Sequence, residues 1–344
     1  MQAEPVNFAH TAPAVAAPLP AHGEAENYRS RQSLHAREPL DAADDLPGRI
    51  GVDRVGDAGW VRKFGGTCST LSIVKSPGNI NQLQIAQVRG RSRLIGCRTV
   101  PPLKILNPRC SSSACHVLAS NYGGGLVGND HIQLDIDCGP ESTFFFGTQA
   151  NTRVYNSGQG AGSCQHTRGR VAAGALAVVG VDPLVLHAGS CFKQSQTWDV
   201  AAGGALGLVD WVVAGRLDIG EEFAFKRYES TIRLHYDGRT ILLDPLRLAP
   251  GVRQMRSPAV MGRFNHLLSI YLVGPRVRDL GRELFSAGTD SGSDLLTAAT
   301  EIDELYVLRA VSASRGPLQQ LLQRLYGRLS ELQWLGFDPT ARKY

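Results

Sequence analysis

Apolar and polar positions alternate through the stretch from Gly123 to Tyr155, and the rest of the chain can be ordered around it. Apolar residues recur at every second position in 132–138, and a second apolar run at 144–146 follows the Gly139-Pro140 turn. A period of two with a Gly/Pro break is typical of two half-buried strands joined by a turn. The segment then ends in the polar run 148–155, which is unusual for a strand that only builds a core. This polar run is therefore the first candidate for a functional surface.

Short β-type runs continue on both sides of this stretch, whereas helical periodicity is confined to the end of the chain. One helix is predicted around Val277, Leu280 and Leu284, and a second from Pro317 to near Gly336. An Asp237-Gly238 pair predicts a hairpin turn. The predicted strands cover 60–64, 67–74, 82–88, 91–97, 172–180, 184–187, 191–200, 205–213, 223–225, 229–236, 240–243 and 267–273. This pattern predicts an all-β-dominated domain with about two helices near the C-terminus.

The first part of the chain has a different composition. Residues 1–48 are rich in Ala, Pro, His, Glu and Asp and show no sustained period. Such a segment buries too little apolar area to offset the entropy of ordering, so it is predicted to be a disordered tail. The remaining residues, 49–344, are predicted to form a single domain.

Composition and charge exclude several classes of protein. The chain has 344 residues, 43% of them hydrophobic and 19% charged, with a net charge of +5. It has no dense basic run with interleaved aromatic residues, so a mildly basic soluble surface is favoured over nucleic-acid binding. No window approaches 18 consecutive apolar residues, which argues against a membrane span. Seven scattered cysteines, and an early apolar stretch interrupted by Pro13, Pro18 and Pro20, indicate a reduced, cytoplasmic protein.

Most candidate chemical sites fail on their spacing. The chain has no Gly-Lys-Ser/Thr phosphate loop, so it should not hydrolyse nucleotides itself. Cys110, Cys115 and His116 provide soft ligands that could bind a transition metal, but a structural zinc site needs four ligands and an ordinary loop is favoured. His131 and His187 lie in or beside predicted strands, where a histidine is more often satisfied by hydrogen bonds than by a metal.

Several acidic residues lie at the ends of predicted strands, beside apolar positions. Solvated turns explain most of them, yet carboxylates that converge in a β scaffold would give hard oxygen ligands to a divalent ion in transit. The residues concerned are Asp130, Asp210, Glu221, Glu222, Glu229 and Asp244.

Five short motifs occur in a recognisable order. They are Gly124-Gly125-Leu126-Val127-x-x-Asp130, Thr148-Gln149-Ala150-x-x-Arg153-Val154-Tyr155, Asp210-Trp211-x-x-x-Gly215-Arg216, Gly220-Glu221 and Arg227-Tyr228-x-Ser230. Together they resemble the UreD/UreH family of urease accessory proteins, over roughly residues 58–336. Each motif is weak alone, and their common order carries the resemblance.

The resemblance implies a β-helix-like, all-β fold with two helices and no enzymatic activity. Members of the family act as a scaffold in nickel delivery to apo-urease, in a complex with the UreF accessory protein and the UreG GTPase. Nickel is thought to pass through an internal tunnel, so no cofactor is held permanently and Ni²⁺ is cargo in transit. The missing phosphate loop agrees with this division of labour.

The resemblance also assigns roles to particular residues. Asp130, Asp210 and Asp244 match positions where carboxylates could line a water-filled passage, and we expect them to relay Ni²⁺. Arg216, Arg227 and Tyr228 are expected in internal salt bridges and packing rather than on a partner surface. The alternative left open is a β-rich enzyme or ligand-binding module whose likeness to the family is only architectural.

Overall fold

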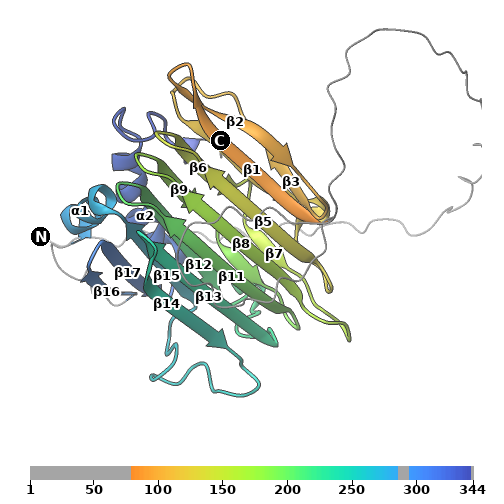
Figure 1. Ribbon diagram of the computed structural model, residues 1–344. Coiled ribbons are helices and arrows are strands. Elements are labelled where there is room, and N and C mark those ends of the chain that lie inside the picture. The colour runs from red at the N-terminus through yellow and green to blue at the C-terminus, as the bar shows by residue number, and fades with distance from the viewer. Residues whose placement is uncertain (1–78, 286–293, 342–344) are drawn as a thin grey trace, which may run out of the picture. The chain divides into compact units, whose positions relative to one another are not determined.

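A computed structural model describes residues 79–285 and 294–341, which form two β-sheets and two α-helices (Figure 1). The predicted tail, and the predicted strands at 60–64 and 67–74, lie outside the described residues. None of the described helices has the length and apolar character needed to span a membrane.

The first sheet has seven strands in the order β14-β13-β11-β8-β5-β1-β2. Strands β1, β5, β8, β11 and β13 are parallel to their neighbours, while β2 and β14 add antiparallel edges. Their bounds are β1 Ile80–Val88, β2 Arg91–Arg98, β5 His131–Cys138, β8 Ser163–Val171, β11 Cys191–Val200, β13 Arg227–Tyr236 and β14 Arg239–Leu248.

The second sheet has ten strands, with β16-β17-β15-β12-β9-β6-β4-β3 in sequence and the short β10 and β7 beside β12. Its bounds are β3 Leu103–Leu106, β4 Cys115–Asn121, β6 Thr143–Thr148, β7 Thr152–Val154, β9 Leu176–Gly180, β10 Leu184–Leu186, β12 Ala205–Val213, β15 His266–Val273, β16 Leu295–Ile302 and β17 Leu305–Ser312. The helices are η1 Tyr122–Gly124, η2 Leu217–Ile219, α1 Pro275–Phe285 and α2 Arg315–Leu329.

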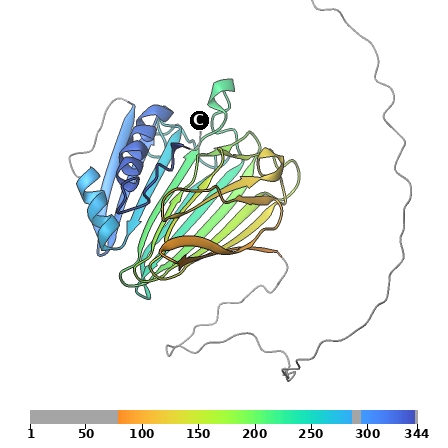
Figure 2. The same cartoon turned by 90° about the horizontal axis from the view of Figure 1, so that it is seen from above.

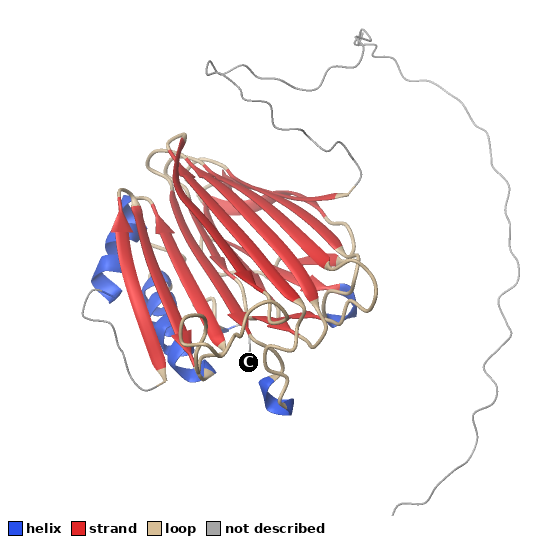
Figure 3. Cartoon of the chain, turned by 90° about the horizontal axis from the view of Figure 1, so that it is seen from below, coloured by secondary structure: helices blue, strands red, loops and turns tan. Residues whose placement is uncertain are grey.

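The chain alternates between the two sheets from β5 to β13. Parallel strands need a crossover between them, and here each crossover is a strand of the opposite sheet instead of a helix. The strands consequently stack side by side in both sheets (Figure 3). This solenoid-like stacking confirms the expected β-helix-like, strand-dominated fold. The Gly139-Pro140 turn joins β5 to β6 as a corner between sheets, not as a hairpin within one.

Two apolar layers hold the sheets and helices together. Phe144 and Phe146 of β6 point between the two sheets, whereas Phe145 points to the opposite face of the second sheet. That face is covered by α1 and α2 through side chains such as Leu280 and Leu322 (Figure 2). Because both faces of β6 are buried, its sequence is continuously apolar instead of alternating.

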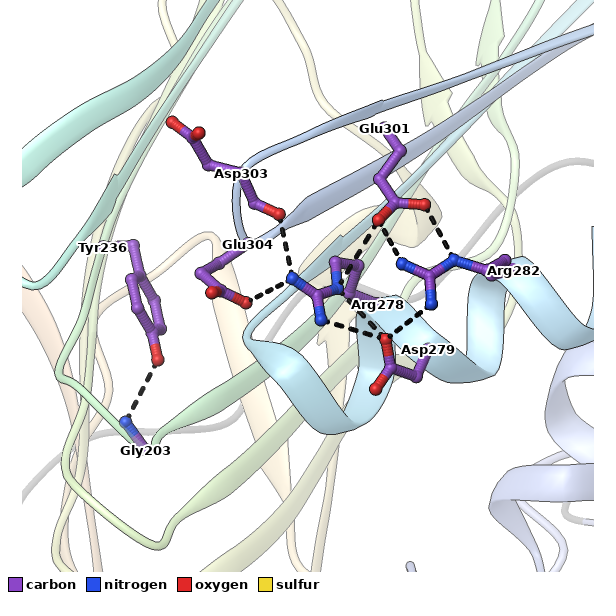
Figure 4. A network of polar contacts seen from close by, with 8 residues as sticks. All are labelled: Gly203, Tyr236, Arg278, Asp279, Arg282, Glu301, Asp303 and Glu304. Carbon is purple, nitrogen blue, oxygen red and sulfur yellow. Dashed lines mark hydrogen bonds and ion pairs between the residues drawn. The ribbon is translucent and has the colours of Figure 1, made fainter.

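Helix α1 is also tied to the β16–β17 hairpin by ion pairs (Figure 4). Arg278 Nη1 lies 2.8 Å from Glu304 Oε2 and donates to the Asp303 carbonyl at 3.0 Å, and Arg282 pairs with Glu301. These pairs are largely solvent-accessible, so each contributes only about 0.2–1 kcal/mol. They orient the helix, while the apolar layer provides most of its stability.

The structure corrects several sequence predictions. Strands β4, β8, β16 and β17 were not predicted, residues 223–225 form no strand, and α2 ends at Leu329. In β8 the buried positions include Ser163, Thr167 and Gly169, so the usual apolar signal is missing. The hairpin at Asp237-Gly238 is confirmed, with φ values of 48° and 75°.

Gly169 of β8 provides a stability test of the packing between the sheets. A Cβ at this position would lie 1.9 Å from Trp198 Cε3, and the Trp198 side chain is fully buried. We expect Gly169→Ala to lower the free energy of unfolding by about 3 kcal/mol, because a closely packed core does not accept the extra methyl group. Denaturant unfolding monitored by tryptophan fluorescence measures the change.

The matched control is Gly251→Ala, where a Cβ would meet no atom within 4 Å. It should change stability by less than about 0.5 kcal/mol. Equal effects of the two substitutions would contradict the described packing of β8 against β11.

Candidate functional site

A cavity of about 140 Å³ lies between the two sheets and is lined by an unusual share of polar side chains. Gln165, Thr167 and Gln194 reach it from the first sheet, and Thr148 and Asp210 from the second. Polar groups are rarely placed between packed sheets because each must find a hydrogen-bond partner there. The cavity is therefore the first place to examine for function.

Gln194 is the centre of a hydrogen-bond network beside this cavity. Its Nε2 donates to Asp210 Oδ1 at 2.9 Å, to the Tyr228 hydroxyl at 2.8 Å and to Ser230 Oγ at 3.0 Å. One amide group thus links β11, β12 and β13 through two N–H hydrogens shared among three acceptors. The network fixes the direction in which the Asp210 carboxyl group points.

Asp210 is a carboxyl group in an environment that disfavours its charge. Its small remaining exposure faces the cavity, and no ion pair to it occurs among the described residues. Burial, with a further contribution from nearby Asp244, raises the pKa of Asp210 to about 6, although the Gln194 hydrogen bond and Arg309 act in the opposite direction. Asp210 is therefore an acid that can exchange a proton for a cation near neutral pH.

Asp244 of β14 lies near Asp210 but has firm partners of its own. The Tyr271 hydroxyl donates to Asp244 Oδ2 at 2.5 Å, and Arg309 forms an ion pair with the same oxygen. The structure thus brings together two of the three carboxylates expected to relay a metal ion. Asp244 is neutralised by Arg309, and Asp210 is left as the carboxyl group without a cation.

Asp130 does not line the cavity. It lies in the loop before β5, where its Oδ2 accepts the Val127 N–H at 2.8 Å and closes a turn. Asn129 in the same turn has a φ of 69°, in the left-handed region that asparagine tolerates. The position of Asp130 thus matches the solvated-turn interpretation, and the third carboxylate of the expected relay is apart from the other two.

Asp182 is a cavity residue that the sequence analysis did not include among the candidate carboxylates. It is 5% exposed, its Oδ2 accepts a hydrogen bond from Thr148 Oγ1 at 2.9 Å, and its own N–H donates to Thr148 Oγ1 at 2.8 Å. The available signal was an acidic residue two positions after the end of the fully buried strand β9. A buried carboxyl group in that position needs a partner, and Thr148 provides one.

The glycines of the family motifs allow close backbone approaches. A Cβ on Gly125 would lie 2.7 Å from the Arg153 carbonyl oxygen, and one on Gly215 would lie 1.9 Å from the Glu221 carbonyl oxygen. Gly124 lines the cavity, and its carbonyl accepts the Tyr155 hydroxyl at 3.4 Å. Gly125 and Gly215 are therefore needed because a larger residue would clash with the neighbouring backbone.

The remaining motif residues lie outside the cavity network or at its margin. Trp211 points to the helix-covered face, opposite to Asp210, and Gln149 is exposed.

Arg216 forms an ion pair with Glu221, and this contact lowers the pKa of Glu221 to about 2. Arg227 lies on the surface, 3.8 Å from Glu229, so the two arginines form surface pairs and not internal ones. Tyr228 is fully buried, as its expected packing role requires.

Cys115 and His116 do not share a site. They are consecutive in β4, so Cys115 points between the sheets while His116 packs against Phe145 and Phe337 on the other face. Burial raises the pKa of Cys115 to about 11, which keeps it a thiol. Within 79–285 and 294–341, no three His, Cys, Asp or Glu side chains are placed to hold a metal ion.

Asp210→Asn tests whether this carboxylate costs stability. The pKa of Asp210 in the folded protein, about 6, lies above its ordinary value of 3.8. Protonation of Asp210 therefore stabilises the folded protein, and this contribution is complete below pH 3.8 and is lost as pH rises through 6. The neutral amide avoids this loss. We expect Asp210→Asn to be more stable than wild type at pH 7.5 by on the order of 2–3 kcal/mol, with the gain disappearing near pH 4.

Denaturant unfolding at several pH values measures this difference, with Asp244→Asn as the matched comparison. Asp244→Asn removes the anion that Arg309 and Tyr271 contact, so it should be less stable than wild type. If Asp210→Asn were also destabilising at pH 7.5, the described cost of the Asp210 charge would be wrong.

Comparison with known proteins assigns the chain to a family. The family model described as UreD urease accessory protein matches residues 79–343. A urease accessory protein UreD of Cytophaga hutchinsonii is 31% identical over 75% of this chain and 95% of its own length. Those of Anaeromyxobacter sp. and Sorangium cellulosum are 33% and 34% identical, each over 76% of this chain, and 88% and 83% of their own lengths. The chain belongs to the UreD family of urease accessory proteins.

Proposed function

We propose that this protein is a non-catalytic scaffold for the maturation of urease, through which Ni²⁺ passes on its way to the urease active site. The observation that carries the proposal is the cavity between the sheets, into which Asp210 presents a carboxyl group without a cation. Because the family is named for urease accessory proteins, urease is the protein that the scaffold would serve.

The chemistry of the cavity suits a metal ion in transit better than one at rest. Carboxylate, amide and hydroxyl oxygens are hard ligands, and the cavity offers them from Asp210, Gln194 and Thr148. A cation replaces the proton on Asp210 and removes the penalty for burying its charge. With one free carboxylate the ion is held weakly, so it can leave again. Asp244 is already bound to Arg309 and to the Tyr271 hydroxyl, so it does not close a site around the ion.

The proposal includes three protein partners in the cytoplasm. The chain has no phosphate loop, so a GTPase such as UreG provides the nucleotide hydrolysis. UreF binds largely through the C-terminal helical region, and apo-urease receives the metal at another face. Arg216 and Arg227 lie exposed at one end of the strands, where a partner can reach them.

The experiment is urease maturation in a host that carries urease, UreF and UreG but lacks its own UreD. We expect wild-type protein to restore urease activity and Asp210→Ala to reduce the nickel content of purified urease about tenfold, because the passage then lacks its cation-binding group. Nickel is measured by elemental analysis of the purified enzyme. Co-purification with UreF and apo-urease should be unchanged, because Asp210 is enclosed within the protein.

Asp199→Ala is the matched control, because it removes the same negative charge from an Asp of β11 whose side chain is 61% exposed. It should leave nickel loading unchanged, as should Asp130→Ala. Full nickel loading with Asp210→Ala would contradict the passage. Failure of wild-type protein to capture UreF, UreG or apo-urease, together with full urease activity in its absence, would contradict the scaffold itself.

A further inference from the structure

A second and larger recess of about 830 Å³ opens over one face of β7 and β10, which present Arg153 and Val185 to it. The η2 loop and the residues just before α2 form its other walls. It shares only Asn151 with the cavity between the sheets, so it is a separate site. We call it the β7–α2 groove.

The charged side chains that line the β7–α2 groove are mostly basic. Arg153 and Arg315 are both exposed and form no ion pair with any described residue, whereas Arg216 is neutralised by Glu221. Among the described lining residues, Asp218 is the sole acid. Apolar groups such as Val185 and Leu217 lie between the charges.

The N-terminus of α2 adds partial positive charge at the same place. Ser314, the N-cap residue, makes no side-chain cap hydrogen bond, and the first turn contains no acidic residue. The N–H groups of Arg315 and Gly316 therefore have neither an intrahelical acceptor nor a capping side chain. Ala313, Ser314 and Arg315 line the groove, so this end of the 15-residue helix faces it.

A buried histidine points to a ligand independently of the helix. His187 is 9% exposed and lines the groove, yet its ring makes no hydrogen bond to a described residue. Its ring contact is an edge-on packing against Tyr155 at 5.1 Å between centroids. Burial, Arg216 and Arg153 lower the pKa of His187, while Glu221 partly opposes them. The ring nitrogens of His187 are not enclosed by protein, so they are open to a ligand in this basic recess.

We propose that the β7–α2 groove binds an oxyanion, either a free phosphate or a carboxylate carried by an acidic peptide segment. Arg153 and Arg315 hold the oxygens with charge-assisted hydrogen bonds, and the first N–H groups of α2 donate to them. His187 takes up a proton when the anion arrives and becomes a further donor. This binding is distinct from the passage of nickel and does not depend on Asp210.

The test uses the full chain in a phosphate-free buffer, with inorganic phosphate and a short glutamate-rich peptide as the two probes. The His187 ring proton signal in NMR is assigned by its loss in His187→Gln. We expect a saturable shift of this signal and a rise of about one unit in the His187 pKa, because an adjacent anion stabilises imidazolium. Saturation by phosphate identifies a small oxyanion, and tighter binding of the peptide identifies a carboxylate-bearing segment.

The double variant Arg153→Gln/Arg315→Gln should weaken binding of the effective probe by at least about tenfold, because two charge-assisted contacts are lost. Both side chains are exposed, so the variant should fold. Arg239→Gln makes the same kind of change at the distant β13–β14 hairpin and should bind as wild type does. The proposal is overturned if neither probe gives a saturable shift, or if the double variant binds as tightly as Arg239→Gln.

Discussion

Parallel pairing is the constraint on which this structure depends. A strand can pair in parallel with the next only after the chain has crossed over, and here the crossover is itself a strand of the facing sheet. Every inward side chain from β5 to β13 therefore meets the inner face of the opposite sheet. Apolar residues such as Phe144 and Trp198 fill most of that space, and any polar residue on an inner face must find its partner inside the protein.

In the polar network beside the cavity, Asp244 has a cationic partner, whereas Asp210 forms no ion pair with a described residue. Gln194 joins three strands, and Asp244 is neutralised by Arg309 and receives the Tyr271 hydroxyl. Asp210 keeps a hydrogen bond but no cation, and its pKa rises accordingly. A fold that needed only stability would favour an amide at this position. The retained carboxyl group is the physical basis for the proposal that a cation passes through the cavity.

The sequence pattern predicted strands of two kinds, those that alternate because one face is buried, such as β5 and β13, and those that are continuously apolar because both faces are buried, such as β12. It failed at β8, where Thr167 and Gly169 occupy inward positions next to the cavity and beneath Trp198. Asp210 and Asp244 could be singled out as carboxylates, but their proximity depends on strand pairings that no local pattern contains. For the same reason Asp130 was grouped with them, although its side chain closes a local turn. The β7–α2 groove was missed because Arg153, His187 and Arg315 come from distant segments.

The proposed passage requires Asp210 to exchange its proton for a metal ion inside the protein. The most direct measurement is the ¹³C NMR signal of the Asp210 carboxyl group in protein labelled at aspartate, assigned by its loss in Asp210→Asn. We expect this signal to titrate near pH 6 and to be the first carboxyl signal to broaden when paramagnetic Ni²⁺ is added. A signal that titrates near pH 4 and stays sharp while surface carboxylates broaden would contradict the proposed passage.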